Sequence, residues 1–400
     1  MADARRRVAF VTPRYGEAVV GGSESVSREA AQGLAARGWD VEVLTTPARD
    51  HYTWAPAYPV GVARHGDVLV RRFELVNEHG LYPGQPDRGE LEQRIALGAT
   101  LDEGQEQAWV NGLFRVPDLY HHLLATGAAY DAIVFSPYLF WTTLVGATVV
   151  PERSIVMPCL HDEGYARLAM VRRVLQASSC AWYLSAPEQE LAEQLGCAPA
   201  RGDLTGAGVE VPAQGDPEAF RARHGLHRPF VLYAGRREEG KGWNLLLEAH
   251  AAAVARGADL DLVTMGVGPV LPPPGSADRV HDLGFVDDGE APSAFAAAAA
   301  YVQPSRHESF SRTVMEAWLA GTLVVANGDS AVVRWHCERS GAGLVWYGLD
   351  ELTAALELVA AAPAVLADVA SVGRRYVLDH YTWPAVLDRM EASLEDLCGG

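Results

Sequence analysis

Short apolar runs alternate with segments of helical periodicity from the start of the chain. Residues 8–12 (VAFVT) combine branched and aromatic side chains, which is typical of a buried strand. In residues 24–37 apolar side chains recur at helical spacing until Gly38 ends the pattern, and residues 41–45 (VEVLT) predict a second strand. This order of strand, helix and strand predicts a parallel sheet with right-handed crossovers, as in a Rossmann-like unit.

The same pattern recurs in both halves of the chain. Further strands are predicted at residues 68–73, 132–135, 154–158 and 181–185, and then at 230–235, 260–265, 301–303 and 323–326. Between the two sets, the glycine-rich residues 206–212 are typical of a hinge. We therefore predict an α/β protein with two doubly wound, Rossmann-like domains, residues 1–212 and 213–380.

Two apolar segments admit more than one interpretation. Residues 132–151 lack charges and are long enough to test as a membrane-spanning helix, but Ser136, Pro137 and three threonines favour a strand, a loop and a helix. Residues 294–300 are rich in alanine, which predicts a helix with a packing role. We expect no stable insertion into a membrane.

Composition narrows the class of protein. The 400 residues are 49% hydrophobic and 21% charged, which is ordinary for a globular protein of about two domains. The formal net charge of −18 argues against nucleic acid or an anionic membrane as the main partner. Five dispersed cysteines without a Cys-x-x-Cys spacing indicate neither a disulfide framework nor a zinc site. The N-terminal segment lacks the apolar stretch of a signal peptide, so we expect a cytoplasmic protein.

Two carboxylates, Glu308 and Glu316, bracket a predicted junction between a loop and a helix. Glu308 follows the strand at residues 301–303, and Glu316 lies one turn inside a helix that Ser311 or Thr313 could begin. Backbone N–H groups at such a helix start attract phosphate, and each carboxylate can bind hydroxyl groups, one set on a sugar and one on a ribose. Taken alone, two such acids are more often solvated surface residues. The junction nevertheless fits a nucleotide that carries a sugar.

Cations follow the first predicted strand of the second domain. The segment 235–242 (GRREEGKG) places Arg236 and Lys241 at the C-terminal end of that strand, where open α/β sheets bind ligands. An arginine fork and a lysine point charge can offset the charge that grows on a departing diphosphate. Arg237 is a less certain candidate, and a pair of surface cations is the alternative interpretation.

Two further motifs follow strands of the first domain. Gly21 and Gly22 precede a predicted helix start at Glu24, where a backbone without side chains can approach a ligand closely. A plain flexible turn is the alternative, and the lack of Gly-x-Gly-x-x-Gly argues against a nicotinamide dehydrogenase. His161 and Asp162 follow the strand at residues 154–158 and favour contacts with sugar or acceptor hydroxyls, although a structural histidine is also compatible. Their spacing does not predict a metal site.

Together these motifs resemble the retaining glycosyltransferases of family 4. Residues 304–311 (PSRHESFS) and 314–326 (VMEAWLAGTLVVA) are similar to the signature segment of that family. The motifs at residues 21–24 and 235–242 match its Gly-Gly-x-Glu and Gly-Arg…Lys-Gly patterns. The resemblance covers nearly the whole chain and implies the GT-B architecture, two facing Rossmann-like domains with a central cleft. It also implies that residues from about 381 to 400 form a helix that crosses back to the first domain.

The resemblance implies a role for each motif. Glu308 holds hydroxyls of the donor sugar, Glu316 binds the ribose, and His161 contacts the sugar from the opposite domain across the cleft. Arg236 and Lys241 hold the donor diphosphate. The other residues implied in binding are Gly21, Gly22 and Glu24 at the donor phosphate or acceptor, Asp162 at the acceptor or ring, Phe285 and Val286 at the base, and Ser309, Phe310, Ser311, Thr313 and Val314 around the phosphates and sugar.

The implied activity is transfer of a sugar from a nucleoside-diphosphate sugar to a hydroxyl of a small molecule or glycan, with retention at the anomeric carbon. No carboxylate is obviously set as a covalent nucleophile, so we expect a front-face displacement in which the leaving phosphate takes the acceptor proton. Arginine and lysine supply the positive charge, so neither a cofactor nor a metal is expected. A sugar-nucleotide epimerase, a phosphorylase and a non-catalytic sugar-nucleotide-binding subunit are the alternatives.

Two features bear on the substrates. Ser309 and Ser311 stand where glycines are frequent in the family, which leaves the identity of the donor sugar open. Residues 51–54 (HYTW) and 76–124 combine aromatic and polar side chains, which is the composition of a carbohydrate or polyol surface. They form a candidate acceptor region, and core and loop are the alternative.

Overall fold

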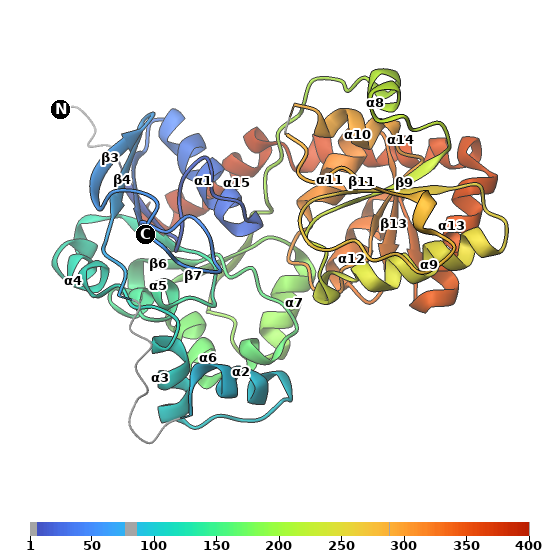
Figure 1. Cartoon of the computed structure of the whole chain (residues 1–400). Helices are drawn as coiled ribbons and strands as arrows, with labels where there is room; N and C mark the ends of the chain where they lie inside the picture. Colours follow the sequence, from blue (N-terminus) through green and yellow to red (C-terminus); the bar gives the residue numbers. More distant parts are fainter. Residues whose placement is uncertain (1–5, 77–85, 288, 400) are drawn as a thin grey trace. The chain divides into compact units, whose positions relative to one another are not determined.

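A computed structural model describes residues 6–76, 86–287 and 289–399, which form two compact units (Figure 1). The first unit is Met1–Gly208 together with Trp383–Gly400, and the second is Val209–Thr382. Residues 77–85 of the candidate acceptor region lie outside the described part.

An eight-stranded sheet forms the centre of the first unit, in the order β3-β4-β2-β1-β5-β6-β7-β8. Neighbouring strands are parallel except β3 and β4. The strands are β1 (Arg7–Val11), β2 (Asp40–Thr45), β3 (Gly61–His65), β4 (Val68–Arg72), β5 (Ala132–Phe135), β6 (Ser154–Val156), β7 (Cys180–Tyr183) and β8 (Gly202–Leu204). The central strands β5, β6 and β7 are buried along their whole length, as expected of parallel strands with both faces covered.

Most helices of the first unit lie between its strands in the sequence. They are α1 (Gly22–Ala36), α2 (Arg88–Ala96), α3 (Glu103–Asn111), α4 (Pro117–Thr126), α5 (Trp141–Leu144), α6 (Ala169–Ala177), α7 (Ala186–Gln194) and the last helix α15 (Trp383–Gly399). The uncharged segment 132–151 forms β5, a loop and short helical turns, as predicted. Across the described residues, no helix combines the length and apolar character required to span a bilayer.

The second unit contains a six-stranded parallel sheet in the order β11-β10-β9-β12-β13-β14. The strands are β9 (Phe230–Ala234), β10 (Asp261–Met265), β11 (Val280–Asp282), β12 (Ala300–Gln303), β13 (Leu323–Asn327) and β14 (Leu344–Trp346). The chain builds outward from β9 in one direction through β10 and β11, and then in the other through β12, β13 and β14. The order therefore reverses between β9 and β12, and ligands of open α/β sheets bind at such a switch point, outside the carboxyl ends of the strands.

Helices of the second unit complete the layers around its sheet. They are α8 (Pro217–His224), α9 (Trp243–Ala255), α10 (Ala291–Ala297), α11 (Arg312–Leu319), α12 (Ala331–Ser340), α13 (Gly348–Ala361) and α14 (Pro363–His380). The alanine-rich segment is only partly helical, because α10 ends at Ala297 and Ala300 already begins β12. The predicted helix over residues 294–300 was therefore wrong in its second half, where burial between two strands overrides the helix propensity of alanine.

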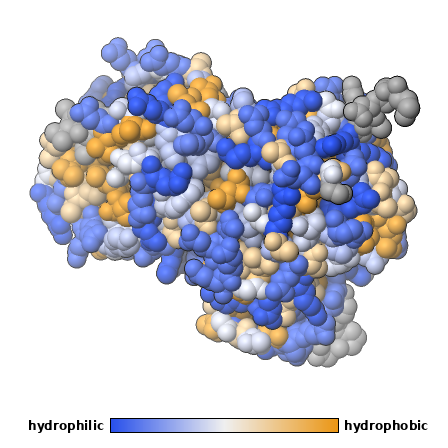
Figure 2. Space-filling view, turned by 180° about the vertical axis from the view of Figure 1, so that it is seen from behind, coloured by the Kyte–Doolittle hydropathy of each residue, from blue (hydrophilic) through white to orange (hydrophobic). Residues whose placement is uncertain are grey.

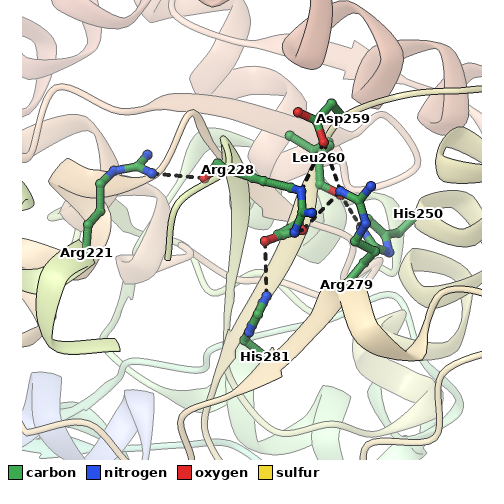
Figure 3. A network of polar contacts seen from close by, with 8 residues as sticks. Arg221, Arg228, His250, Asp259, Leu260, Arg279 and His281 are labelled. Carbon is green, nitrogen blue, oxygen red and sulfur yellow. Dashed lines mark hydrogen bonds and ion pairs between the residues drawn. The ribbon is translucent and has the colours of Figure 1, made fainter. Parts of the chain in front are cut away.

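A network of ion pairs and hydrogen bonds lies at the amino-terminal ends of β10 and β11, at the opposite end of the sheet from the switch point (Figure 3). Asp261, the buried first residue of β10, lies 3.1 Å from His281 and 3.4 Å from Arg279. Arg228 and Arg279 both reach Asp259, at 3.2 and 3.0 Å. These contacts hold the bottom of the sheet together and leave its carboxyl edge to the loops described next.

The face of the molecule in Figure 2 is largely hydrophilic, with hydrophobic residues in separate small areas.

Candidate active site

The candidate site is built from two loops that leave the carboxyl ends of β9 and β12. These strands are hydrogen-bonded neighbours, with Tyr301 paired to Leu232, so the residues that follow them emerge side by side. The β9 loop carries the arginine and lysine motif, and the β12 loop carries Glu308. Lys241 and Glu308 are 67 residues apart in sequence, yet the switch point brings them to one edge of the sheet.

Lys241 and Glu308 join the two loops directly. The Lys241 ammonium donates to Glu308 Oε1 at 2.8 Å. The lysine side chain is 32% exposed and the glutamate 14%, so the pair lies at the surface of the edge rather than in the core. Lys241 is also the only lysine in the chain; the other members of its 33 lysines and arginines are all arginines. That compositional signal, available from the sequence, sets this position apart.

Gly242 allows the two loops to approach each other. Its φ of 72° lies in the left-handed region, and a Cβ there would collide with the backbone carbonyl of Pro304 in the β12 loop. A glycine is therefore required both for the turn into α9 and for the contact between the loops.

Glu316 lies on α11, which begins where the β12 loop ends. Glu308 and Glu316 both influence the same buried phenol, that of Tyr301. Burial is the main cause that raises the pKa of Tyr301 well above its usual value, and the charges of neighbouring groups, these two carboxylates among them, raise it further. Glu308 and Glu316 therefore both lie near the Tyr301 phenol. The roles predicted for this pair, at the donor sugar and the ribose, stay predictions.

The start of α11 differs in detail from the prediction. Ser311 occupies the residue before the helix, but its side chain does not cap it; the hydroxyl oxygen accepts from Gln303 Nε2 at 2.7 Å. Thr313 lies inside the helix and accepts a hydrogen bond from the Tyr301 hydroxyl at 2.8 Å. The N–H of Val314 donates to the Ser311 carbonyl at 3.1 Å, so it already has a partner within the first turn of the helix.

Gln303 braces the loop that carries Glu308, although the sequence did not single it out. Its amide accepts from the Ser305 N–H at 3.2 Å and donates to Ser311, so one buried side chain joins the two ends of the loop. Asn327, at the end of β13, donates to the Pro304 carbonyl at 2.9 Å. The only sequence signal for Gln303 and Asn327 was that each is a polar residue at the end of an apolar strand.

The two arginines of the β9 loop have different environments. Arg236 is exposed and lies 3.1 Å from Glu238. Arg237, the less certain candidate, is buried; it pairs with Asp282 and donates to Thr264 Oγ1 at 3.0 Å and to the Gly268 carbonyl at 2.7 Å. Arg237 therefore ties the ends of β9, β10 and β11 together, and Arg236 is the arginine that solvent and ligands can reach.

Four of the residues predicted to bind the donor differ in exposure. Phe285, after β11, is 70% exposed, and Val286 is half-buried. Phe310 is buried, and its ring meets those of His336 and Tyr381 edge-on at 5.1 and 5.0 Å between centroids. Phe310 thus anchors its loop, while the half-buried Ser309 lies beside it in the chain.

The double glycine of the first unit makes room for a buried ion pair. Gly21 precedes α1, which begins at Gly22, and a Cβ on Gly21 would collide with the carboxylate of Glu24. Glu24 pairs with Arg14, and both side chains are 5% exposed. Ser23 also donates to Glu24 at 2.8 Å. The structure thus places Glu24 inside the loop, and Arg14 is a component that the sequence interpretation missed.

His161 lies on the loop after β6. Its Nδ1 is 3.6 Å from Glu163 Oε1, which accepts from the Tyr138 hydroxyl at 2.8 Å. Asp162 is exposed and lies 2.5 Å from Arg167. His161 and Asp162 therefore share one loop, with each close to a charged neighbour.

A buried carboxylate that the sequence did not reveal supports this loop. Glu188, in the first turn of α7, accepts from the backbone N–H groups of Leu160 and Leu184, each at 2.6 Å. Burial raises the pKa of Glu188 to about 8, while these backbone hydrogen bonds act in the opposite direction. The pattern of Ser185 followed three residues later by Glu188 is a helix-start signal, but the reach to residue 160 is set by the fold.

The candidate acceptor region is divided between core and surface. Trp54 is buried with a φ of 53°, lies against Phe114 at 4.3 Å between centroids, and faces the Arg14 guanidinium. Tyr52 is exposed.

In the described residues, no group of three or more His, Cys, Asp or Glu side chains is arranged to hold a metal ion.

Comparisons with known proteins match this geometry. Residues 228–366 match the family described as Glycosyl transferases group 1, which confirms the resemblance inferred from the sequence. The D-inositol 3-phosphate glycosyltransferase 1 of Catenulispora acidiphila is 29% identical over 74% of this chain and 72% of its own length. Matches to other curated relatives, all named as glycosyltransferases, span only a third to a half of their lengths (33% to 49%).

Solved structures share the fold over the whole chain. Sucrose-phosphate synthase from Thermosynechococcus elongatus aligns with a TM-score of 0.75 at 20% identity, covering 99% of this chain and 100% of that one. Anabaena HepE, solved in complex with UDP-glucose, aligns with a TM-score of 0.68 at 16% identity, covering 98% and 100%. These likenesses confirm the predicted α/β fold of the GT-B type.

Proposed function

Starting from the glycosyl transferases group 1 domain at residues 228–366, we propose that the chain is a retaining glycosyltransferase of family 4. It moves a sugar from a nucleoside-diphosphate sugar to a hydroxyl of a small molecule or glycan. The observation that carries this proposal is the contact between Lys241 and Glu308 at the switch point of the second sheet. The names of the relatives and the UDP-glucose bound to a protein of the same fold support it.

The donor diphosphate binds between Lys241 and the start of α11. An ammonium has three N–H donors, so Lys241 can hold Glu308 and a phosphate oxygen at once. The first turn of α11 adds N–H groups and the positive end of the helix dipole. Arg236, exposed on the same loop, supplies a second cation. Together these groups stabilise the charge that develops on the diphosphate as the glycosidic bond breaks.

The carboxylates hold the two sugars of the donor. Glu308 accepts hydrogen bonds from hydroxyls of the transferred sugar, and Glu316 accepts those of the ribose. The acceptor hydroxyl attacks the anomeric carbon from the face that the diphosphate leaves, and the leaving phosphate takes its proton. This front-face displacement retains the anomeric configuration. The roles predicted for His161, Asp162, Gly21, Gly22, Phe285, Val286 and Ser309 stay predictions, as do a cytoplasmic location and independence of metal ions.

The test is product analysis with the full chain. UDP-, GDP-, ADP- and dTDP-sugars are incubated with a panel of hydroxyl acceptors, and nucleotide release and the anomeric proton coupling of the product are measured. We expect one nucleotide to be released with transfer of its sugar and retained configuration, with and without a chelator. Lys241→Ala should lower kcat by about 10²–10³-fold, whereas Arg256→Ala, which removes a surface contact to Glu357, should not.

Other products would contradict the proposal. An epimerised nucleotide sugar would indicate an epimerase, and a sugar 1-phosphate formed from free phosphate would indicate a phosphorylase. Donor binding without any turnover across the acceptor panel would indicate a binding subunit. Loss of activity with a chelator would refute the metal-independent mechanism alone.

A further inference from the structure

A buried tyrosine lies directly beneath the start of α11. Tyr301, on β12, has no exposed surface, and its hydroxyl donates to Thr313 Oγ1 at 2.8 Å. Thr313 is the second residue of α11 and is half-buried, so it connects the interior of the sheet to the helix end. The contact links β12 to α11 at the junction that Glu308 and Glu316 bracket.

The roles of the two hydroxyl groups in this hydrogen bond determine where the Thr313 proton points. Burial is the main cause that raises the pKa of Tyr301, and the hydrogen bond with Thr313 acts in the opposite direction. The phenol is the donor to Thr313 Oγ1 at 2.8 Å. Thr313 Oγ1 is therefore the acceptor. A hydroxyl group has one donor besides its acceptor positions, so the Thr313 proton is directed to a different oxygen.

The donors and cations at the junction favour a ligand phosphate as the group that receives this proton. Two carboxylates flank the junction, and an anion placed there needs donors and cations to offset them. Lys241 already contacts Glu308 at 2.8 Å, and the first turn of α11 offers backbone N–H groups. The neighbouring buried phenol of Tyr233 donates to a backbone group instead, the carbonyl of Arg236, at 2.5 Å. Tyr301 differs in that it donates to a side-chain hydroxyl.

We propose that Tyr301 is a positioning residue that holds the Thr313 hydroxyl so that it donates to an oxygen of the leaving diphosphate. The proposal rests on the proposed function and extends it: phosphate recognition at α11 uses a side-chain hydroxyl oriented from within the sheet, in addition to backbone groups and Lys241. Because a hydrogen bond to a charged group is stronger than one between neutral groups, this donor distinguishes nucleoside diphosphates from nucleosides.

The experiment is calorimetric titration of the full chain with UDP, GDP, ADP and dTDP, and with the four corresponding nucleosides. The variants are Tyr301→Phe, Thr313→Val, Thr313→Ser and the double variant of Tyr301→Phe with Thr313→Val. We expect Thr313→Val to weaken diphosphate binding by about tenfold or more, and Tyr301→Phe to weaken it in the same direction. Nucleoside binding should be unchanged, Thr313→Ser should restore diphosphate binding, and the double variant should bind no more weakly than Thr313→Val.

A matched control separates lost stability from lost positioning. Tyr130→Phe removes another buried phenol, which donates to Glu42 at 2.7 Å in the first unit, and it should leave diphosphate affinity at the wild-type value. Equal weakening of diphosphate and nucleoside by Tyr301→Phe, wild-type affinity in that variant, or fully additive losses in the double variant would overturn the positioning role. If the wild type binds none of the four diphosphates, it is the proposed function that fails.

Discussion

At the scale of single residues, the partner of each charged side chain determines whether it can bind a ligand. Arg14 and Glu24 neutralise each other inside the first unit, where loss of either would leave an uncompensated buried charge at a cost of about 3–5 kcal/mol. Arg237 is occupied by Asp282 and by groups of β10 in the same way. Lys241 and Glu308 also form a pair, but at the surface of the sheet edge, where both side chains are partly exposed.

His336 predicts a specific dependence of stability on pH. It is fully buried behind Phe310, and burial lowers its pKa to about 3. The unfolded chain takes up this proton near pH 6.5 and the folded chain does not, so the free energy of unfolding falls as pH decreases from about 6.5 towards 3, by about 1.4 kcal/mol per pH unit. Urea unfolding at pH 7.5 and 5.5 measures it. His336→Gln should lose less stability between these values than the wild type, and the exposed His121→Gln should behave as the wild type. Equal pH dependence in His336→Gln would refute this account.

The sequence predicted the residues that carry charge at the site better than it predicted their partners. Lys241, Glu308 and Glu316 were named from motifs at strand ends and a helix start, which are local signals. Arg14, Gln303 and Glu188 were not, because their roles depend on residues that the fold brings close. The burial of Glu24 was equally hidden, since its spacing from Gly21 and Gly22 is the same whether the carboxylate faces a ligand or an arginine.

At the scale of elements, strand order determines where chemistry can occur. The second sheet reverses direction between β9 and β12, and the loops after these two strands carry the two motifs of the site. Buried strands with continuous apolar runs were predicted close to their observed bounds. The strands β3, β8, β11 and β14 were missed, because edge strands are short and partly exposed and so lack that apolar signal.

Gly242 tests whether the contact between the two loops matters. Gly242→Ala forces a left-handed backbone on alanine and a collision with the Pro304 carbonyl, so we expect a loss of about 1–3 kcal/mol in unfolding free energy and a lower kcat/KM. Gly240→Ala is the matched control in the same loop, because a Cβ there meets nothing within 4 Å. Chemical denaturation and steady-state kinetics of both variants provide the measurement. A Gly242→Ala protein with wild-type stability and kinetics would show that the loops do not need this approach.

At the scale of the whole molecule, the last residues of the chain belong to the first unit. Helix α15 follows the second unit in sequence but packs in the first, where Leu387 lies against Gly33 and Trp383 against Gly208. Trp39 Nε1 donates to Glu391 at 2.9 Å. The folding of the first unit therefore depends on residues separated from its remainder by the entire second unit.

Met390, fully buried on α15, allows this dependence to be measured. Met390→Ala should lower the stability of the first unit by about 2–5 kcal/mol, while the exposed Glu395→Ala should change it little. Hydrogen exchange followed at the level of peptides resolves the two units, and we expect faster exchange in β1 and β5 with unchanged exchange in β9 and β12. Faster exchange confined to the second unit would contradict the assignment of α15 to the first.

The central claim, that the edge formed by β9 and β12 binds a nucleoside diphosphate, can be tested on Lys241 alone. This residue carries the only side-chain amine in the chain. When the folded protein is treated with an acetylating reagent, mass spectrometry of the peptide that contains Lys241 therefore reports on a single side chain. With UDP, GDP, ADP or dTDP at tenfold excess over its dissociation constant, we expect Lys241 to be acetylated about tenfold more slowly, with no effect of the nucleoside alone. An unchanged rate in the presence of a diphosphate that binds the chain would contradict the account.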